Sequence, residues 1–484
     1  MIEVENFIYR YRSLEKIFKF NELENLEIYF SKPSELNDQM ENYMNIIWQG
    51  DEIAFKGLFK HYLYTLCQLY IIATLVKPGE KLDKYNLPIF IQYKDLSLPL
   101  METTFKEIYE KFFSSNEIIA IPKLMADSHK KYSIDEILTI FKTIHLYAYF
   151  VINTQIKKDI FNKDLLKEDS YNKIFEEIKS WDGYKNILKL LNQNSNKNEV
   201  ATQIYNLTLQ QQTYQLYLKK MYKDKDTYNI EILSFEFPEL YINQIKKLMY
   251  GNFYVACFSG TYKNEPMWSH YANCENGICL RFKIKNENNK QYIKIYSPTG
   301  ISCGSNGLKI EKNWSYSILN NVDYNYEYPE IDFFKSLGCI PHPVIDSFWL
   351  CNYNKTKFSS CLNVYKDMDE WRTRYYKKAR EYICTKSKNW EYEQEYRLFK
   401  MDMMHPTYED TDNRFAKFHF EDLDAIIFGR KVSLDDKKRV IKIIQAHCEK
   451  NGQKGFKFYD LYYSTLTKQL EIKPCNDYIS LFYK

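Results

Sequence analysis

Alternating hydrophobic and polar positions at the two ends of the chain predict β-strands. Near the beginning, Phe7–Arg12 alternates with a period of two, and a second run, Leu26–Ser31, ends before Pro33. Such alternation is typical of strands, because successive side chains point to opposite faces of a sheet. Further runs with strand character are Phe253–Ser259, Gly277–Phe282, Tyr392–Phe399, Ala425–Phe428, Phe456–Tyr463 and Gln469–Ile472.

The middle of the chain has a different pattern. From about residue 49 to residue 249, apolar residues recur at helical spacing with few helix breakers. Helices are also expected over Ser13–Asn21, over Trp371–Lys388, and after Ser433 as an N-cap. We therefore expect an α+β protein in which residues 1–48 and 250–484 form one discontinuous mixed-sheet domain. Residues 49–249 form a helical insertion, which a domain closed by both chain ends tolerates. The pattern does not assign helices or strands to residues 285–365.

Composition narrows the class of protein without pointing to a partner. The chain has 484 residues, 45% of them hydrophobic, and a formal net charge of only +4. Global charge therefore gives no argument for binding nucleic acid or a membrane. Eleven cysteines without a C-x-x-C pair indicate reduced thiols. The apolar run Leu63–Val76 is too short to span a bilayer, and a buried helix explains it better. A soluble, cytoplasmic protein is expected.

Two glutamates form the sharpest local pattern. On the strand expected over Tyr392–Phe399, the side chains of Glu393, Glu395 and Arg397 share one face. Two neighbouring carboxylates raise each other's pKa unless a cation or water screens them, so such a pair is costly when buried. One interpretation is a catalytic pair, and the other is a solvated strand face with an ion pair to Arg397.

Arg10 and Arg12 share a face of the first strand. A guanidinium pairs with phosphate through two hydrogen bonds, so these residues are candidates for a phosphate site. The alternative is a surface strand, or a partner for the acidic strand.

His270 is a candidate base or metal ligand, but no fourth ligand completes a zinc spacing with Cys274 and Cys279. A packed, hydrogen-bonded histidine is the alternative, and we expect no metal.

The helix expected over Trp371–Lys388 is rich in cations interleaved with tyrosines. Basic side chains with stacking rings can bind single-stranded nucleic acid. The alternative is an ordinary solvated helix face. The basic residues proposed to contact nucleic acid or another acceptor are Arg372, Arg374, Lys377, Lys378 and Arg380.

Several catalytic motifs do not occur in the sequence. It has no P-loop, no G-x-G-x-x-G turn, no G-x-S-x-G elbow and no H-E-x-x-H pair. Readings as a P-loop nucleotidase, a hydride-transferring enzyme or a zinc protease of that type therefore have no support.

Five segments in order resemble a bacterial domain-of-unknown-function family, numbered twenty-nine seventy-one. They are Ile8–Ser13, Ile28–Pro33 running into Asn37-Asp38, Met267–Ala272 with Gly277, Trp390–Arg397, and Ile427–Gly429. The resemblance covers about half of the chain, over residues 1–45 and 250–435. Gln39 stands where the family usually has proline, and the helical stretch is an unusually large insertion.

The order of an arginine, a serine and a Glu-x-Glu pair is similar to the ADP-ribosyltransferase pattern. That resemblance implies an ADP-ribosyltransferase-like sheet domain and NAD as a substrate, with Arg12 or Arg10 on the diphosphate. It implies that Ser31 braces the nicotinamide-ribose pocket, with His270 counted among the NAD-binding residues. Glu395 is then the catalytic acid, and Glu393 orients the acceptor. A carboxylate on the ribose 2′-hydroxyl suits an oxocarbenium-like state, in which positive charge grows on the sugar.

The resemblance therefore implies an NAD-dependent transferase that modifies a protein or a nucleic acid. It further implies an effector or toxin of phage defence, switched by a regulatory protein or a phage-derived trigger and without a membrane partner. Two alternatives stay open. One is a nucleic-acid-binding effector or metal-dependent nuclease, which uses the basic helix for backbone contact and Glu393 and Glu395 with a divalent cation. The other is a non-enzymatic sensor or scaffold that acts through the helical insertion.

Overall fold

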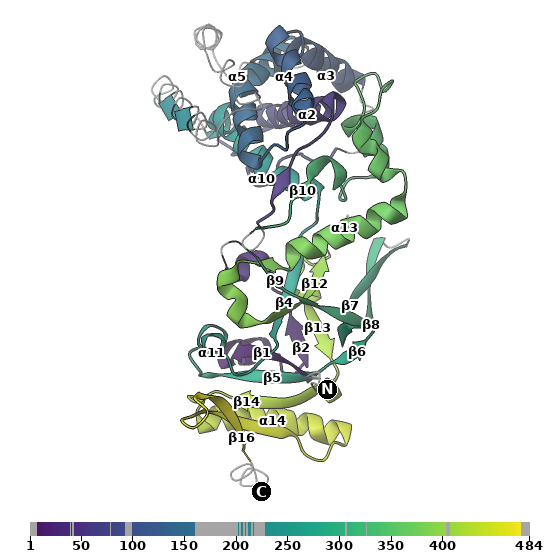
Figure 1. Cartoon of the computed structure of the whole chain (residues 1–484). Coiled ribbons are helices and arrows are strands. Elements are labelled where there is room, and N and C mark those ends of the chain that lie inside the picture. The colour runs from purple at the N-terminus through teal and green to yellow at the C-terminus, as the bar shows by residue number, and fades with distance from the viewer. Residues whose placement is uncertain are drawn as a thin grey trace. The chain divides into compact units, whose positions relative to one another are not determined.

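The protein is a mixed α/β structure with a large mixed sheet and many helices (Figure 1). The computed structural model describes residues 7–38, 40, 43–77, 79–91, 99–159, 228–304, 307–325, 327–402 and 407–475, with single helical positions between 202 and 216.

The chain divides into two compact units. The sheet unit contains residues 1–44, 252–329 and 378–484, and the helical unit contains residues 45–251 and 330–377. The sequence-based division had placed residues 330–377 in the mixed-sheet domain, whereas their contacts lie within the helical unit. The boundary between Lys377 and Lys378 falls inside α13 (Met368–Ile383).

The strands of the sheet unit come from both ends of the chain. They are β1 (Phe7–Ser13), β2 (Glu27–Tyr29), β4 (Phe253–Ser259), β5 (Gly277–Lys283), β6 (Lys285–Glu287), β7 (Lys290–Gly304), β8 (Gly307–Asn321), β9 (Asp323–Tyr324), β11 (Thr385–Lys386), β12 (Glu395–Met401), β13 (Phe415–Phe418), β14 (Leu423–Phe428), β15 (Lys457–Ser464) and β16 (Gln469–Pro474). Its helices include α1 (Leu14–Phe20), α11 (Glu265–Tyr271) and α14 (Leu434–Asn451).

The main sheet has the strand order β16-β15-β14-β5-β1-β4-β12-β8-β7-β13-β2, with β6 beside β7. The pair of β14 and β15 is parallel, and the other pairs of this sheet are antiparallel. Strand β1 is therefore central, between β5 and β4, although it comes first in sequence. A separate parallel pair joins β9 and β11.

Both faces of the sheet are buried near β1. On one face, Ile8 packs in a cluster that includes Ile441 of α14. On the other face, Tyr9 and Tyr11 pack in a cluster with Trp268 of α11. Burial of these apolar side chains on opposite faces follows from the period-two alternation of the strand.

Local signals fix the helix ends as expected. The Ser13 hydroxyl accepts a hydrogen bond from the Lys16 N–H at the start of α1, and Asn21 ends the helix in the left-handed conformation. Ser433 caps α14 in the same way through the Asp436 N–H, which confirms the predicted N-cap. Such caps satisfy backbone N–H groups that have no partner within the helix.

Two predicted elements near the acidic pair are wrong. The strand expected from Tyr392 begins only at Glu395, because a 3₁₀ helix occupies Lys388–Glu393. The helix expected to reach Lys388 ends at Ile383 and gives way to β11.

The helical unit is built mainly from helices. The longer ones are α2 (Glu52–Leu75), α3 (Pro99–Phe112), α4 (Asn116–Asp127), α5 (Ile134–Asp159) and α10 (Phe237–Ile245). Shorter ones are α9 (Tyr228–Glu231), a π-helical turn at Ile232–Glu236 and α12 (His342–Val344). A short parallel pair joins β3 (Ile46–Ile47) and β10 (Ile331–Asp332). The apolar run Leu63–Val76 lies at the end of α2 and is largely buried, as predicted.

A buried histidine of this core is held between two polar groups. His61 lies between the Tyr241 hydroxyl, at 2.8 Å, and the Ile89 carbonyl oxygen, at 2.9 Å. Burial lowers the pKa of His61 to about 3, so the ring is neutral at physiological pH.

One described helix segment, Ile134–Lys157, is long and apolar enough to cross a membrane, and 61% of its apolar window is buried inside the structure. Core helices of globular proteins pass the same test.

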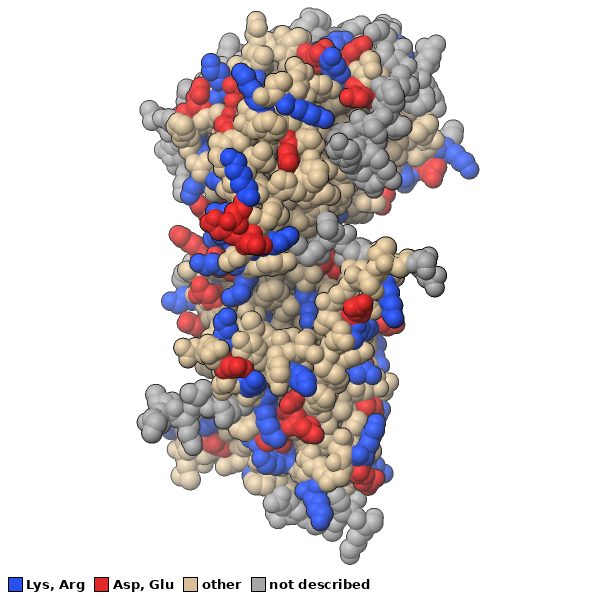
Figure 2. Space-filling view, turned by 90° about the vertical axis from the view of Figure 1, so that its right-hand side faces the viewer, with Lys and Arg blue, Asp and Glu red and all other residues tan. Residues whose placement is uncertain are grey.

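None of the eleven cysteines, all of which lie in the described part of the chain, forms a disulfide. On the face shown in Figure 2, basic and acidic side chains are interspersed, in keeping with the small net charge.

Gly57 of α2 packs directly against another backbone. A Cβ atom at this position would lie 1.9 Å from the Trp349 carbonyl oxygen. Alanine normally stabilises a helix interior by about 1 kcal/mol relative to glycine. We expect the opposite here: Gly57→Ala lowers the free energy of unfolding by about 1–3 kcal/mol, because the two backbones must separate. Urea unfolding measures this change, and Gln68→Ala in the same helix is the control, expected to stay near wild type.

Candidate buried charge site

Glu395 and Arg397 lie on the same face of β12 and pair directly. β12 runs antiparallel to β4, with Glu395 opposite Ser259. The guanidinium holds both carboxylate oxygens: Arg397 Nε lies 2.8 Å from Oε1, and Nη2 lies 3.0 Å from Oε2. Arg397 Nη1 also donates to the Ile383 carbonyl oxygen at 2.6 Å. The ion pair is therefore bidentate and anchored to the backbone.

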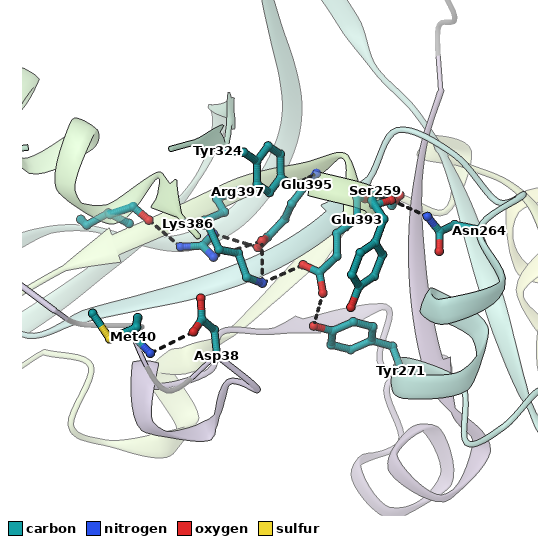
Figure 3. A network of polar contacts seen from close by, with 12 residues as sticks. Asp38, Met40, Ser259, Asn264, Tyr271, Tyr324, Lys386, Glu393, Glu395 and Arg397 are labelled. Atoms are coloured by element: carbon teal, nitrogen blue, oxygen red, sulfur yellow. Dashed lines mark hydrogen bonds and ion pairs between the residues drawn. The ribbon is translucent and has the colours of Figure 1, made fainter. Parts of the chain in front are cut away.

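Glu393 reaches the same place by a turn, and not by strand alternation. It ends the 3₁₀ helix Lys388–Glu393, and Gln394 follows in the left-handed conformation with φ of 45°. This turn brings the Glu393 carboxylate beside that of Glu395 (Figure 3). The two residues are thus neighbours, as the spacing suggested, but for a different geometric reason.

Lys386 of β11 joins the two carboxylates. Its ammonium lies 2.7 Å from Glu393 Oε2 and 3.4 Å from Glu395 Oε2 (Figure 3). It also lies over the Trp390 ring, 4.7 Å from the centroid. Lys386, Glu393, Glu395 and Arg397 are only 3%, 2%, 4% and 1% exposed. We call these four residues the buried charge network; it rules out the solvated strand face.

Polar groups from other elements complete the surroundings of the network. The Tyr271 hydroxyl donates to Glu393 Oε1 at 2.7 Å, and the Glu395 N–H donates to the Tyr324 hydroxyl at 2.7 Å. Ser259 Oγ donates to the Glu393 carbonyl at 2.7 Å. Asn264 caps α11 and donates to the Tyr392 carbonyl, so it ties the helix that carries Tyr271 to the segment before Glu393.

The two carboxylates have opposite pKa shifts. Burial raises the pKa of Glu393, and the charge of Glu395 adds to this, while Lys386 and Tyr271 oppose it. Burial also acts to raise the pKa of Glu395, but the charges of Arg397 and Lys386 outweigh it and lower the value to about 2. Glu395 is therefore the fixed anion of the pair, and Glu393 is the more basic carboxylate.

Asp38 has one carboxylate oxygen without a partner among the described residues. It follows the 3₁₀ helix Pro33–Glu35 and is 7% exposed. Oδ1 accepts the Met40 N–H at 2.9 Å, whereas Oδ2 is buried and has no hydrogen-bond partner within the described residues. In Figure 3 its carboxylate points toward Lys386. Buried polar atoms are seldom left unpartnered in native structures, so this oxygen is a candidate to receive a ligand donor.

The arginines expected to hold phosphate have other partners. Arg10 is buried, and its guanidinium donates to the carbonyl oxygens of Cys257, at 3.1 Å, and Tyr29, at 3.0 Å. Burial lowers the pKa of Arg10 to about 10. Arg12 pairs with both carboxylate oxygens of Glu22. These contacts occupy donors that a phosphate would need.

Ser31 and His270 are the other two residues expected to bind NAD. Their contacts are with residues outside the buried charge network. Ser31 pairs through its backbone with Val255 of β4. His270 is exposed on α11, and its ring lies 6.4 Å from that of Trp390, between centroids. Its neighbour Tyr271 is the residue that reaches Glu393. The segment that the sequence pattern singled out thus reaches the network through Tyr271, and the role expected for His270 stays a prediction.

The basic residues expected to contact an acceptor lie exposed along α13. They are Arg372, Arg374, Lys377, Lys378 and Arg380. Three of them pair with acids of the same helix, Arg372 with Asp369, Arg374 with Glu370 and Lys378 with Glu381. Of the interleaved tyrosines, Tyr375 and Tyr382 are buried, which leaves Tyr376 exposed for stacking.

Residues 267–398 match the family model described as "Protein of unknown function (DUF2971)". The matched range begins at α11 and ends in β12, so it contains Tyr271 and all four residues of the buried charge network. No curated protein and no solved structure matches the chain. Within the described residues, no group of three His, Cys, Asp or Glu side chains is placed to hold a metal ion.

Sequence reasoning missed Lys386, Tyr324 and Asp38 as members of the site. Lys386 was counted as part of a basic helix, and Tyr324 lies in a stretch for which no element was predicted. Asp38 was noted only as part of a family segment. The one signal that points to the network is a lysine near the end of the expected helix, a few residues before two glutamates.

Removal of one charge should show how strongly the stability of the fold depends on charge balance within the network. Arg397→Met leaves the Glu395 carboxylate buried beside Lys386 alone, so we expect the free energy of unfolding to fall by about 3–5 kcal/mol. Urea unfolding measures this. The double variant Glu395→Gln/Arg397→Met removes both charges and should lose less than the sum of the single variants. Arg430→Met, which breaks the exposed pair with Glu275, is the control at about 1 kcal/mol or less.

The pKa of Glu395 predicts how stability depends on pH. Because its value in the fold, about 2, lies below the ordinary 4.5, the ionised carboxylate stabilises the fold above about pH 4.5. This contribution is lost as the pH falls from about 4.5 towards about 2. Between pH 5.5 and pH 3.5, roughly, wild type should lose more stability than Glu395→Gln. Parallel urea-unfolding curves for the two proteins across this range would contradict the assignment.

Proposed function

We propose that the buried charge network is the centre of an ADP-ribosyltransferase-like enzyme site that acts on NAD. The observation that carries this proposal is the pair of neighbouring carboxylates with opposite pKa shifts, Glu393 and Glu395, around one lysine. Glycosidic bonds are cleaved by carboxylate pairs whose environments differ in this way.

The reaction needs only carboxylate chemistry. The bond between the nicotinamide nitrogen and C1′ of the ribose breaks, and its electron pair leaves with nicotinamide, which becomes neutral. The acceptor forms the new bond to C1′, and Glu393 takes the proton that the acceptor loses. Fixed negative charge near the ribose stabilises the positive charge that grows there in the transition state.

The environment of each carboxylate supports a division of roles that differs from the sequence-based one. Glu395 is held by Arg397 through both oxygens, so it serves as a fixed charge and positions Lys386. Glu393 is held by Tyr271 and Lys386 and has the raised pKa, which suits a general base. In this proposal Glu393 is the catalytic residue, and Glu395 is a positioning residue.

The proposal does not use Arg10 or Arg12 for the diphosphate, because the guanidinium of each donates to other groups. Asp38 supports it, since its buried acceptor oxygen, which points toward Lys386 in Figure 3, suits a ribose hydroxyl. The acceptor is a macromolecule, and an effector or toxin of phage defence is the cellular role that goes with this activity.

The experiment is release of nicotinamide from NAD by the purified full-length chain, with and without cell extract and with and without EDTA. We expect Glu393→Gln to reduce turnover about a hundredfold or more, because the acceptor loses its base. EDTA should leave turnover unchanged, whereas it would abolish the activity of a metal-dependent nuclease.

Glu391→Gln is the matched control, because Glu391 lies exposed in the same 3₁₀ helix. It should keep wild-type turnover. Circular dichroism and urea unfolding of each variant separate loss of the base from loss of the fold. No NAD turnover by wild type even with extract present, or equal turnover by Glu393→Gln, would reject the proposal.

A further inference from the structure

The hairpin of β7 and β8 presents a row of aromatic and basic side chains on one face. In the antiparallel register, Lys294 stands opposite Tyr316 and Tyr296 stands opposite Trp314. Tyr292 lies on the same face, two residues before Lys294, and Lys285 of β6 stands opposite it. We call these six residues the aromatic–lysine face.

The opposite face of the same strands belongs to the core. Ile293 and Ile295 of β7 and Leu319 of β8 are buried in the main hydrophobic cluster. By contrast, Trp314 is 39% exposed and Tyr316 is 54% exposed. The alternation of the strands thus determines which side chains are exposed, and it leaves the Trp314 and Tyr316 rings of the aromatic–lysine face exposed to solvent. Neighbouring exposed aromatic side chains are a mark of binding surfaces.

The rings are already ordered by contacts with one another and with cations. The Trp314 ring stacks on that of His419, with centroids 3.7 Å apart and planes 15° apart. Tyr296 lies 5.6 Å from Trp314, between ring centroids. The ammonium groups of Lys285 and Lys294 lie 4.9 Å and 5.9 Å from the centroid of the Tyr316 ring. A ligand that stacks on these rings would therefore meet a surface with little side-chain freedom left to lose.

A cavity of about 460 Å³ opens beside this face. Its lining combines lysines, aromatic rings and two acids: Lys283, Ile284, Lys285, Tyr292, Ile293, Lys294, Tyr316, His419, Glu421 and Asp422. One oxygen of Asp422, Oδ2, is buried and finds no hydrogen-bond partner in the part of the chain that the structure describes. The cavity thus offers rings for stacking, cations for phosphate and an acceptor oxygen for an amino group.

The lysines at the cavity differ in how they are engaged. Lys283 donates to the Glu421 backbone carbonyl at 3.1 Å, and Lys285 pairs with Glu287 at 2.8 Å. Among the described residues no carboxylate pairs with Lys294. Lys294 is therefore not held in an ion pair, although its charge acts on the Asp422 carboxylate of the same cavity. Its place beside the exposed Tyr316 ring suits a phosphate next to a stacked base.

We infer that the aromatic–lysine face and its cavity bind single-stranded nucleic acid, with bases stacked on Tyr316 and Trp314 and a backbone phosphate on Lys294. Sheet faces with exposed aromatic rings read unpaired bases in this way, because every base has a stacking face. A duplex would keep its bases stacked on each other and away from these rings. The contact is local, which fits the interspersed charges on the surface shown in Figure 2.

This inference is independent of NAD chemistry, since it uses none of the residues of the buried charge network. It also differs from the expectation that α13 binds nucleic acid. On α13 the stacking partners are mostly buried, and three of the cations pair with acids of the same helix.

The test is fluorescence anisotropy of labelled single-stranded RNA and DNA oligonucleotides, about 12 nucleotides long, with the full-length protein over a range of salt concentrations. We expect Tyr316→Ala to weaken binding about tenfold, by loss of one stacked base. Lys294→Ala should reduce the slope of log affinity against log salt by about 0.7, the value for one phosphate contact on a single strand.

Tyr463→Ala is the control for Tyr316→Ala, because Tyr463 is also exposed, at 42%, but lies on β15. It should bind like wild type. The inference is overturned by no binding by wild type up to about 100 µM at low salt, no loss in Tyr316→Ala, equal loss in Tyr463→Ala, or loss only in Arg372→Ala/Arg374→Ala. Competition by free uridine monophosphate as strong as by the oligonucleotide would assign the cavity to a mononucleotide and also overturn it.

Discussion

The bidentate pair of Arg397 and Glu395 is the interaction on which the candidate site depends. A charge taken out of water without a partner costs several kcal/mol, so each buried ion of the network requires its counterion. Lys386 then balances Glu393, which gives two cations and two anions within four nearly inaccessible side chains. Because these residues come from β11, a 3₁₀ helix and β12, charge balance couples three consecutive segments to one another.

The same need for charge balance gives the two carboxylates different pKa values. Arg397 lowers the pKa of Glu395, so that this carboxylate stays ionised, and its charge in turn helps to raise the pKa of Glu393. Two identical side chains two residues apart therefore present different acid–base properties. The hydroxyl of Tyr271 and the unpartnered oxygen of Asp38 lie at the side of Glu393 and Lys386, where a ligand could meet the network.

The aromatic–lysine face follows from a different constraint, namely the alternation of β7 and β8. Ile293 and Ile295 must enter the core, and the period of two then turns Tyr292, Lys294 and Tyr296 outward. The sheet unit would thus combine a charge-balanced interior with a separate stacking surface. Together, the two proposals describe an enzyme whose nucleic-acid contact lies in the same compact unit as its catalytic residue, Glu393.

Strands with strong period-two alternation and helices with clear caps, such as β1, β5 and α14, could be predicted because their signals are local. The pairing of Glu395 with Arg397 is local in the same sense, since both lie on one strand face. Tertiary structure alone decided that this face is buried, that the helix α13 stops at Ile383, and that Lys386 turns inward between the carboxylates. The physical reason is that the same string of charged residues suits a solvated helix or a buried ion network. Which of the two forms depends on long-range packing of β4 and β8 against β12, and no local pattern in the sequence encodes it.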